Sequence, residues 1–394
     1  MNRIDFVKTH KGELKPENPR FLNLDNYAQI DKISSPDDSA SGSYVYVARD
    51  KEGNGVVLKI TNIDSYDYRN LSYTYPEMEA KIYKVTNKLV ENNITPHIFM
   101  LMDSLNPTFI DKNHDFYNII KHESYVSAMT LETFHKKDKL VVFDELIDVN
   151  YMTEAIMFNL LFQILYTLEA FNMIGLRHND LHSGNIMVIK TPGIKGRCNK
   201  YILANGTSVR LPYIGYDTRI FDFDRSCKLG KRKSGEEILM PDDSFKKYHQ
   251  KCDYNTKFDT YKILGYVHKY TKLKGIRQFI ESCFPSKELI KTGTLKGRTY
   301  NNKFNGKRYY QIKWKPVDKS MLPTSTILSR LADKVHEPSC ESIIETYSLG
   351  SIAPYKKKQS LKSRVSKYIP LRTRYRRSYT KNKRSRRRSR NTIA

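Results

Sequence analysis

The sequence predicts an α+β protein, with a β-rich amino-terminal part that carries one main helix and a mostly helical carboxy-terminal part. Two alternating apolar runs, Tyr44 to Ala48 and Val56 to Ile60, flank a turn rich in Gly and Asn and indicate neighbouring strands. A helical stripe of apolar residues follows over Tyr75 to Val90. A longer apolar pattern over Thr153 to Gly175 predicts a second, more deeply buried helix.

Length and composition indicate a folded chain with a sizeable core. The chain has 394 residues, of which 39% are hydrophobic, enough for two domains or one two-lobed fold. The longest apolar region, Met152 to Leu176, contains polar residues such as Glu154, so we expect an amphipathic helix and no membrane span. The amino terminus lacks the apolar segment of a secretory signal. Five scattered cysteines without a CxxC pair predict free thiols in a reducing, intracellular compartment.

The net charge of +26 is concentrated at the carboxy terminus. Residues 355–394 contain 17 Lys or Arg and no Asp or Glu, which leaves 51 basic against 42 acidic residues in the rest of the chain. The run Arg384 to Arg390 has no apolar periodicity, so we expect a disordered tail. Such a tail attracts polyanions and predicts DNA or RNA binding through residues 355–394. A nuclear-localisation signal or a merely solvated tail explains the same composition.

The residues that suggest chemistry lie in the segment Leu176 to Val188, LRHNDLHSGNIMV. Phosphoryl transfer from a nucleotide needs a carboxylate that accepts the proton of the incoming hydroxyl, and oxygen ligands that hold Mg²⁺ against the phosphates. Asp180 and Asn185 supply both kinds of group from one short loop. A further metal carboxylate, Asp222, follows a β-rich segment in the sequence RIFDFDRS.

These two segments resemble the catalytic and metal-binding loops of the protein kinase superfamily. The DLHSGN form is similar to haspin-type kinases, the kinases of large DNA viruses, and the choline and aminoglycoside kinases. In the amino-terminal part, Lys59 matches the strand lysine that contacts the phosphates in this family. We expect Glu79 to pair with Lys59, because its neighbours at i+3 and i+4 face inward, whereas Glu77 should face water.

The resemblance implies a two-lobed kinase-like fold with bound ATP and Mg²⁺. The expected divisions are an extension at 1–30, an N-lobe at 31–132, a C-lobe at 133–350 with an inserted hairpin at 191–217, and a basic tail at 351–394. The implied nucleotide-binding residues are Lys59, Glu79, Gly42, Val45, Val57, Asn185 and Asp222, with Asn185 and Asp222 as the metal ligands.

Two further segments belong to the expected site. The backbone of Thr130 to Thr133 is expected to bind the adenine, from its order in the chain alone. Asn205-Gly206 predicts a type I′ turn in the inserted hairpin, which is expected to lie beside the active site.

The chain also departs from the family pattern. Gly42 is the only glycine near the expected phosphate-covering loop, although small residues from Ser39 to Ser43 would still let the backbone approach phosphate oxygens. His182 stands where Ser/Thr protein kinases usually place a lysine on the transferred phosphate, and Asp224 replaces the usual glycine. Two structural roles follow from the resemblance: His178 bonds backbone near Asp222, and Asp259 anchors the catalytic loop.

Taken as a whole, the resemblance implies an ATP- and Mg²⁺-dependent serine/threonine protein kinase of a large DNA virus that acts on viral or host proteins. Such a kinase is expected in the virion or host cytoplasm, with the nucleus open because of the basic tail. One alternative is a nucleic-acid-binding structural virion protein on a degenerate kinase scaffold, favoured by the tail and the poor glycine loop. Another is a small-molecule kinase of the choline or aminoglycoside type, which gives no reason for the tail.

Overall fold

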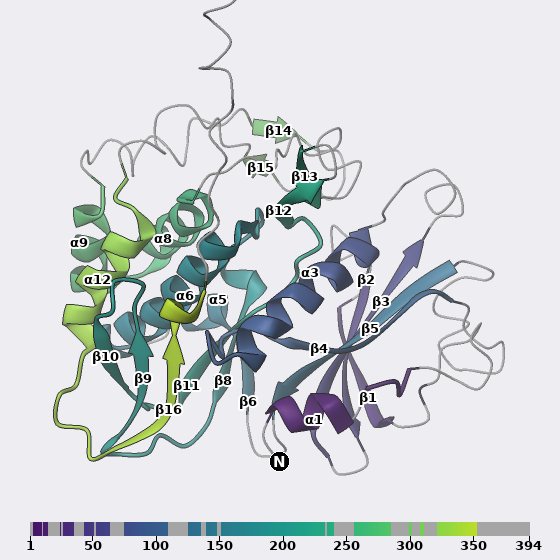
Figure 1. The fold of residues 1–394 in the computed structure, drawn as a ribbon, viewed down its shortest axis with the longest axis horizontal. Helices are drawn as coiled ribbons and strands as arrows, with labels where there is room; N and C mark the ends of the chain where they lie inside the picture. The colour runs from purple at the N-terminus through teal and green to yellow at the C-terminus, as the bar shows by residue number, and fades with distance from the viewer. Residues whose placement is uncertain are drawn as a thin grey trace, which may run out of the picture. The chain divides into compact units, whose positions relative to one another are not determined.

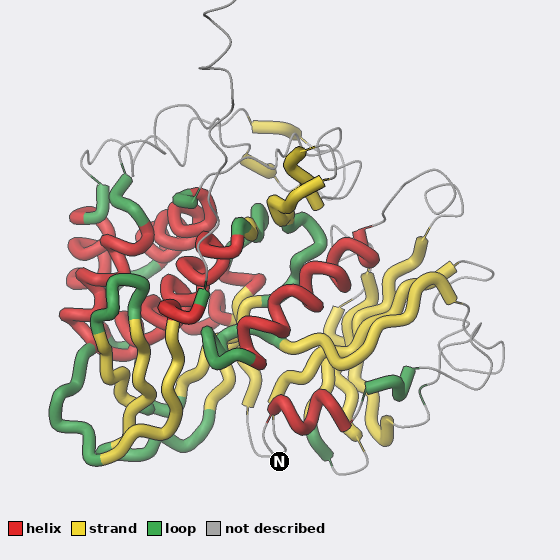
Figure 2. The backbone as a smooth tube through the Cα atoms, in the orientation of Figure 1, coloured by secondary structure: helices red, strands yellow, loops and turns green. Residues whose placement is uncertain are grey.

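The computed structural model describes fifteen stretches of the chain, and all lie in the first of its two compact units, Met1–Tyr355 and Lys356–Ala394. The described stretches contain several sheets and seven α-helices, so this part is a mixed α+β fold, as predicted (Figures 1 and 2). The expected basic tail lies outside them from residue 353 onward. The described residues are 3–9, 11–14, 24, 27–34, 43–50, 53–63, 75–108, 125–134, 139–147, 151–232, 235–239, 256–284, 299–301, 308–310 and 321–352.

A five-stranded antiparallel sheet forms the amino-terminal part (Figure 1). The two alternating runs are its second and third strands, so the predicted pair of strands is confirmed. The strands, in sheet order, are β1 (Tyr27–Ser34), β2 (Ser43–Asp50), β3 (Gly55–Ile63), β5 (Tyr125–Phe134) and β4 (Met100–Thr108).

The segment expected to bind adenine lies inside this sheet. Thr130 of β5 faces Leu58 of β3 on one side and Asp103 of β4 on the other. Glu132 likewise has a partner on each side. Thr130, Leu131 and Glu132 are therefore paired on both sides, whereas neither neighbouring strand pairs with Thr133, so the expected adenine contact of this segment stays a prediction.

Two helices accompany the sheet. Helix α3 (Tyr75–Glu91) confirms the predicted stripe, because Met78 and Ile82 are fully buried and the helix contacts β4 and β5. Helix α1 (Arg3–Thr9) lies within the expected amino-terminal extension. Its Arg3 guanidinium binds both carboxylate oxygens of Glu132 at 2.9 Å, which fastens this helix to β5.

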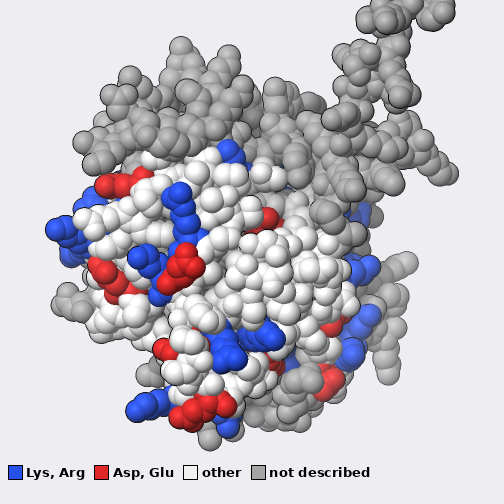
Figure 3. Space-filling view, turned by 60° about the vertical axis from the view of Figure 1, so that its left-hand side comes forward, with Lys and Arg blue, Asp and Glu red and all other residues white. Residues whose placement is uncertain are grey.

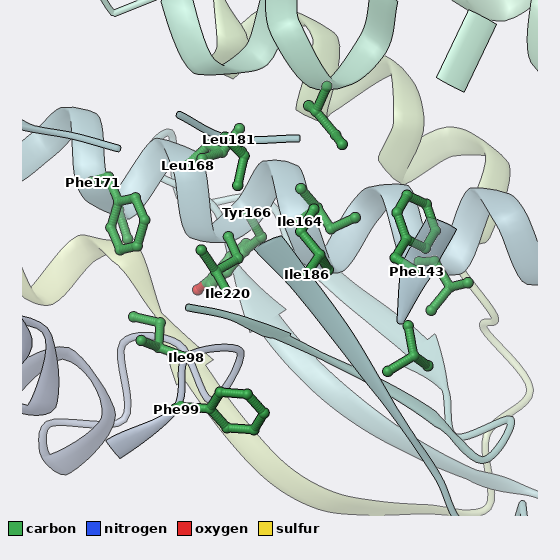
Figure 4. Close-up of a cluster of buried hydrophobic side chains, with 14 of the residues drawn as sticks. Ile98, Phe99, Phe143, Ile164, Tyr166, Leu168, Phe171, Leu181, Ile186 and Ile220 are labelled. Carbon is green, nitrogen blue, oxygen red and sulfur yellow. The ribbon is translucent and has the colours of Figure 1, made fainter. Parts of the chain in front are cut away.

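Helix α6 (Glu154–Ile174) is the central helix of the carboxy-terminal part. The Thr153 hydroxyl accepts a hydrogen bond from Ile156 N–H at its start, and Gly175 ends it at a φ of +72°, which L side chains rarely adopt. Figure 4 shows its Ile164 and Phe171 in one buried cluster with residues of the neighbouring strands. Among the described residues α6 alone is long and apolar enough to cross a membrane, but 72% of that window is buried in the fold, as in a core helix.

Helix α6 contacts α8, α9 and α12 and the strands β7 and β11. Two three-stranded sheets have the orders β11-β8-β6 and β13-β12-β7, and a bridge from Ile98 to Ile220 joins the amino-terminal part to β11. Helices α9 and α12 belong to the part of the chain that was predicted to be mostly helical. The elements are α5 (Phe143–Leu146), α8 (Phe258–Tyr270), α9 (Lys274–Ser282), α12 (Thr324–Val335), β6 (Lys139–Val142), β7 (Leu176–Arg177), β8 (Ile186–Lys190), β11 (Tyr216–Ile220), β12 (Cys227–Arg232), β13 (Gly235–Leu239), β14 (Thr299–Asn301), β15 (Arg308–Tyr310), and the 3-10 turns η1 (Ser183–Asn185) and η2 (Leu349–Ser351).

The inserted hairpin is present, with β9 (Arg197–Ile202) antiparallel to β10 (Ser208–Pro212). Its turn is not type I′, because that turn needs positive φ at both central residues and Asn205 lacks it. Instead Leu203 C=O accepts from Gly206 N–H, and Gly206 takes the left-handed conformation alone, at a φ of +85°.

The hairpin also lies elsewhere than expected. It leaves the β8–β11 strand pair at the Lys190–Tyr216 end, whereas Ile186 and Ile220, next to the candidate site, pair at the opposite end. The hairpin then packs against α6 and α12, and β9 pairs in parallel with β16 (Ser342–Ser348) (Figure 1). The expectation that it lies beside the active site is therefore wrong.

A disulfide joins this hairpin to the carboxy-terminal strand region. Cys198 of β9 is bonded to Cys340, just before β16, with their Cα atoms 6.0 Å apart. Cys283 is a free, buried thiol in the described part of the chain. The expectation of five free thiols is therefore wrong. The two cysteines lie 142 residues apart, and a pairing over such a separation leaves no local signal in the sequence.

Candidate active site

Lys59 of β3 and Glu79 of α3 meet in the interior. Lys59 Nζ lies 2.8 Å from Glu79 Oε2, and Glu79 is 1% exposed whereas Glu77 is only partly buried. The predicted pairing and the choice of Glu79 over Glu77 are confirmed. Burial raises the pKa of Glu79 to about 7, although the Lys59 charge opposes this rise.

Asp222 completes the arrangement around this lysine. Its Oδ1 lies 2.7 Å from Lys59 Nζ, so one ammonium bridges two carboxylates that lie 143 residues apart in the chain. Burial disfavours the charged lysine, but Asp222 and Glu79 outweigh it and raise the pKa of Lys59 well above its ordinary value. Asp222 has a φ of +65°, rare for a residue other than glycine, and its N–H donates to the Tyr83 hydroxyl of α3 at 3.2 Å.

The loop that carries Asp180 is bonded directly to the segment before Asp222. His178 Nε2 donates to the Phe221 carbonyl at 2.8 Å, which confirms the structural role expected of His178. Phe221 N–H donates to the Asn185 carbonyl at 3.2 Å, and Asn185 Nδ2 donates to the Asp180 carbonyl at 3.0 Å. These bonds bring the proposed base, both proposed metal ligands and the strand lysine into one connected cluster.

Asp259 at the start of α8 anchors the same loop, as expected. Its two carboxylate oxygens accept from His178 N–H at 2.8 Å and from Asn179 N–H at 3.0 Å. Asn179 has a φ of +65°, and its Nδ2 donates to the Arg225 carbonyl at 2.9 Å. A backbone conformation that costs energy is thus held by bonds from both sides, as is common at functional sites.

Three residues of the DLHSGN motif make local contacts that hold its turn in place. His182 Nδ1 accepts from Gly184 N–H at 3.1 Å and caps the turn η1. A Cβ on Gly184 would lie 2.9 Å from the His182 ring, so the glycine is needed for this close approach. Ser183 donates to Asp144 of α5 at 2.8 Å, which fastens the turn from outside.

Asp180 itself is paired with two cations that the sequence did not indicate. Its Oδ2 lies 2.8 Å from Arg225 NH1, and its Oδ1 lies 3.1 Å from Lys262 Nζ. Burial opposes ionisation, but Lys262 and Arg225 lower the pKa of Asp180 well below its usual range. Lys262 follows Asp259 by three residues on α8, so a lysine one turn after an anchoring aspartate is the signal that could have revealed it.

The structure describes some of the residues that the resemblance implies for a nucleotide site. Val45 lies opposite Lys59 in the β2–β3 register, and Val57 precedes Lys59 by two residues. All three therefore share one face of the sheet, because side chains alternate along a strand. Gly42 lies outside the described residues, and so does most of the small-residue loop before β2.

The donor set fits Mg²⁺ in type. Asp222 and Asn185 offer oxygen atoms, and Mg²⁺ is usually held by one or two carboxylates together with substrate phosphates. Asn185 Nδ2 donates to the Asp180 carbonyl, so the side-chain oxygen of Asn185 is the atom that could bind a cation. Within the described stretches no group of three or more His, Cys, Asp or Glu residues is preassembled to hold a metal by itself.

Comparison with known proteins adds nothing to this geometry. No protein-family model matches the chain, and no curated protein matches it.

Proposed function

We propose that this chain is an ATP- and Mg²⁺-dependent serine/threonine protein kinase with a two-lobed kinase-like fold. The observation that carries the proposal is the convergence of five residues predicted from the sequence. Lys59, Glu79 and Asp222 are joined by bonds of 2.7 and 2.8 Å, and the loop with Asp180 and Asn185 is bonded to the residue before Asp222. A degenerate scaffold would be expected to lack at least one of these groups.

Each residue has a distinct task in this proposal. Asp180 accepts the proton of the substrate hydroxyl, and Lys59, oriented by Glu79, binds phosphate oxygens. Asp222 and Asn185 would hold Mg²⁺. When bound, ATP and the metal supply the phosphoryl group and neutralise its developing charge. Because the chemistry needs little beyond positioning and charge, the tethered loops are the main contribution of the protein.

Metal-dependent nucleotide binding tests the assignment of the ligands. We expect Asp222→Ala and Asn185→Ala to weaken Mg²⁺-dependent ATP binding, measured by titrating Mg²⁺ at fixed ATP in a calorimetric or fluorescence assay. Asp333→Asn, which changes an exposed carboxylate on α12, is the matched control and should bind as the unchanged protein does. An unaltered metal requirement in both site variants would remove these residues from the metal site.

The basic tail supports a second function, nucleic-acid binding, alongside catalysis. The observation in its favour is the run of 17 Lys or Arg without an acidic residue over 355–394. Together with the resemblance to large-DNA-virus kinases, it favours a virion-associated protein that acts on viral or host proteins. A small-molecule kinase remains the alternative, and transfer of γ-phosphate to choline or an aminoglycoside in preference to protein would favour it.

A further inference from the structure

Both carboxylate oxygens of the proposed base are bound to cations. Arg225 binds Oδ2 of Asp180 at 2.8 Å, and Lys262 binds Oδ1 at 3.1 Å. A general base must accept a hydrogen bond from the hydroxyl that it deprotonates. The arriving hydroxyl must therefore displace one of these two cations or share an oxygen with it.

Lys262 is the cation suited to release Asp180. Its ammonium has three N–H donors, of which one binds Asp180 and another donates to the Asn179 carbonyl at 3.0 Å. When the contact with Asp180 opens, the bond to Asn179 still holds Nζ beside the base. The side chain of Lys262 is 19% exposed, so it is not sealed in the interior of the fold.

We propose that Lys262 is a catalytic residue that moves from Asp180 Oδ1 to an oxygen of the phosphoryl group in transit. This inference rests on the proposed kinase function. The substrate hydroxyl oxygen forms the new bond to the γ-phosphorus, while the bond from that phosphorus to its bridging oxygen breaks and its electron pair leaves with ADP. Asp180 takes the hydroxyl proton, and the negative charge on the transferred group lies next to the Lys262 ammonium.

The position of Lys262 on helix α8 supports this role. One turn earlier on α8, Asp259 binds the backbone of His178 and Asn179, so the helix that carries Lys262 also fixes the catalytic loop. The position expected from the family to carry a lysine holds His182 instead, and its Nδ1 is committed to Gly184 N–H. Lys262 thus brings a cation to the reacting group from a helix about 80 residues further along the chain.

Kinetic measurements on the full chain form the first arm of the test. We expect Lys262→Met to lower kcat for transfer to a protein substrate by about 10²–10³-fold, the usual cost of removing one group that stabilises transition-state charge. Lys262→Arg, which keeps the charge, should lose less. Lys269→Met on the same helix, whose amino group binds the Tyr270 hydroxyl, is the matched control and should retain the wild-type rate.

The second arm measures binding without turnover. The probes are ADP with Mg²⁺, and the same mixture with aluminium fluoride, a mimic of the phosphoryl group in transit, each read as a shift in melting temperature. We expect all proteins to be stabilised by ADP with Mg²⁺, and the additional shift from aluminium fluoride to be lost only in Lys262→Met. Retention of that additional shift, or equal loss of both shifts, would overturn the proposal, because equal loss indicates a structural role.

The two arms separate this inference from the proposed function. If the unchanged protein neither transfers phosphate nor responds to ADP with Mg²⁺, the kinase proposal is wrong and the role of Lys262 is rejected with it. If the unchanged protein does both and Lys262→Met does so equally well, only the role of Lys262 is wrong.

Discussion

At the scale of single residues, the site brings buried and partly buried ionisable groups together at short distances. Lys59 lies between Glu79 and Asp222, and Asp180 lies between Arg225 and Lys262. The first set could be predicted, because each member belongs to a recognisable motif. The two cations on Asp180 were not predicted. The contact of Lys262 depends on how α8 packs against the loop, and its only sign in the sequence is its position one turn after Asp259.

Asp224 is a residue whose titration is altered by this setting. It is 5% exposed, and burial, followed by the nearby charge of Asp222, raises its pKa well above the usual range. A carboxyl whose pKa is higher in the folded than in the unfolded chain, where it is about 3.9, binds its proton more tightly when folded. The stability that this proton contributes is complete at low pH and is lost as pH rises from the unfolded value through the folded one.

We therefore predict that Asp224→Asn, which is uncharged at every pH, is more stable than the unchanged protein near neutral pH. Ionisation of Asp224 in the folded chain costs stability at pH 8, so removing the charge should raise the free energy of unfolding there. Denaturant unfolding from pH 5 to 8 measures it, with Asp333→Asn as control. If the stability of Asp224→Asn falls with rising pH as steeply as that of the unchanged protein, ionisation of Asp224 does not destabilise the fold.

At the scale of elements, periodic patterns within the chain predicted the helices well. Helix α3 and helix α6 were visible from their apolar stripes, and Thr153 and Gly175, the bounds of the predicted pattern, are the residues that cap α6. Contacts between distant segments were not visible. The parallel pairing of β16 with β9 has no local signature, and the full length of β5 depends on neighbours on both sides.

The turn of the inserted hairpin could be predicted only in part. Asn205-Gly206 correctly predicted a reversal between two strands, but one further loop residue changes the turn type. The place of the hairpin in the fold is then decided by packing, since the Tyr201 ring makes an edge-to-face contact with Tyr166 of α6 and a tilted contact with Tyr347 of β16. In the sequence, the aromatic side chains of this hairpin are the sign that one of its faces is buried.

The disulfide between Cys198 and Cys340 ties this packing together and gives a prediction for the element. We expect Cys340→Ala to lower the free energy of unfolding by about 2–5 kcal/mol, the usual cost of losing a native disulfide. Cys283→Ala removes a free thiol and serves as the comparison for cysteine loss alone. A peptide map without reductant should contain a cross-linked Cys198–Cys340 fragment; two alkylated, separate peptides would contradict the bond.

At the scale of the whole molecule, charge is divided unevenly along the chain. The face in Figure 3 shows basic and acidic side chains interspersed, and the 354 residues before the tail contain 51 basic against 42 acidic residues. The strong excess is in residues 355–394. We therefore assign polyanion binding to the tail and catalysis to the folded part.

Deleting residues 355–394 should abolish binding to DNA and RNA while sparing phosphoryl transfer. Binding by the full chain should show little sequence preference and weaken steeply as salt rises, because neutralised phosphates release counterions. Filter binding across a salt series compares the intact and truncated proteins, and Arg386, Arg387 and Arg388 changed to Gln provide an intermediate case. Equal retention by the intact and truncated proteins would place the binding elsewhere.

The central claim is that Asp180 is the base of a phosphoryl transfer, and one comparison tests it most directly. Transfer of labelled γ-phosphate from ATP to acidic and basic protein substrates is measured for the full chain and for Asp180→Asn, with melting temperature and ATP·Mg²⁺ binding checked in parallel. We predict that the unchanged protein transfers phosphate, and that the variant stays folded, binds nucleotide, and transfers about 10²–10⁴-fold more slowly. Undiminished transfer by Asp180→Asn would contradict the account.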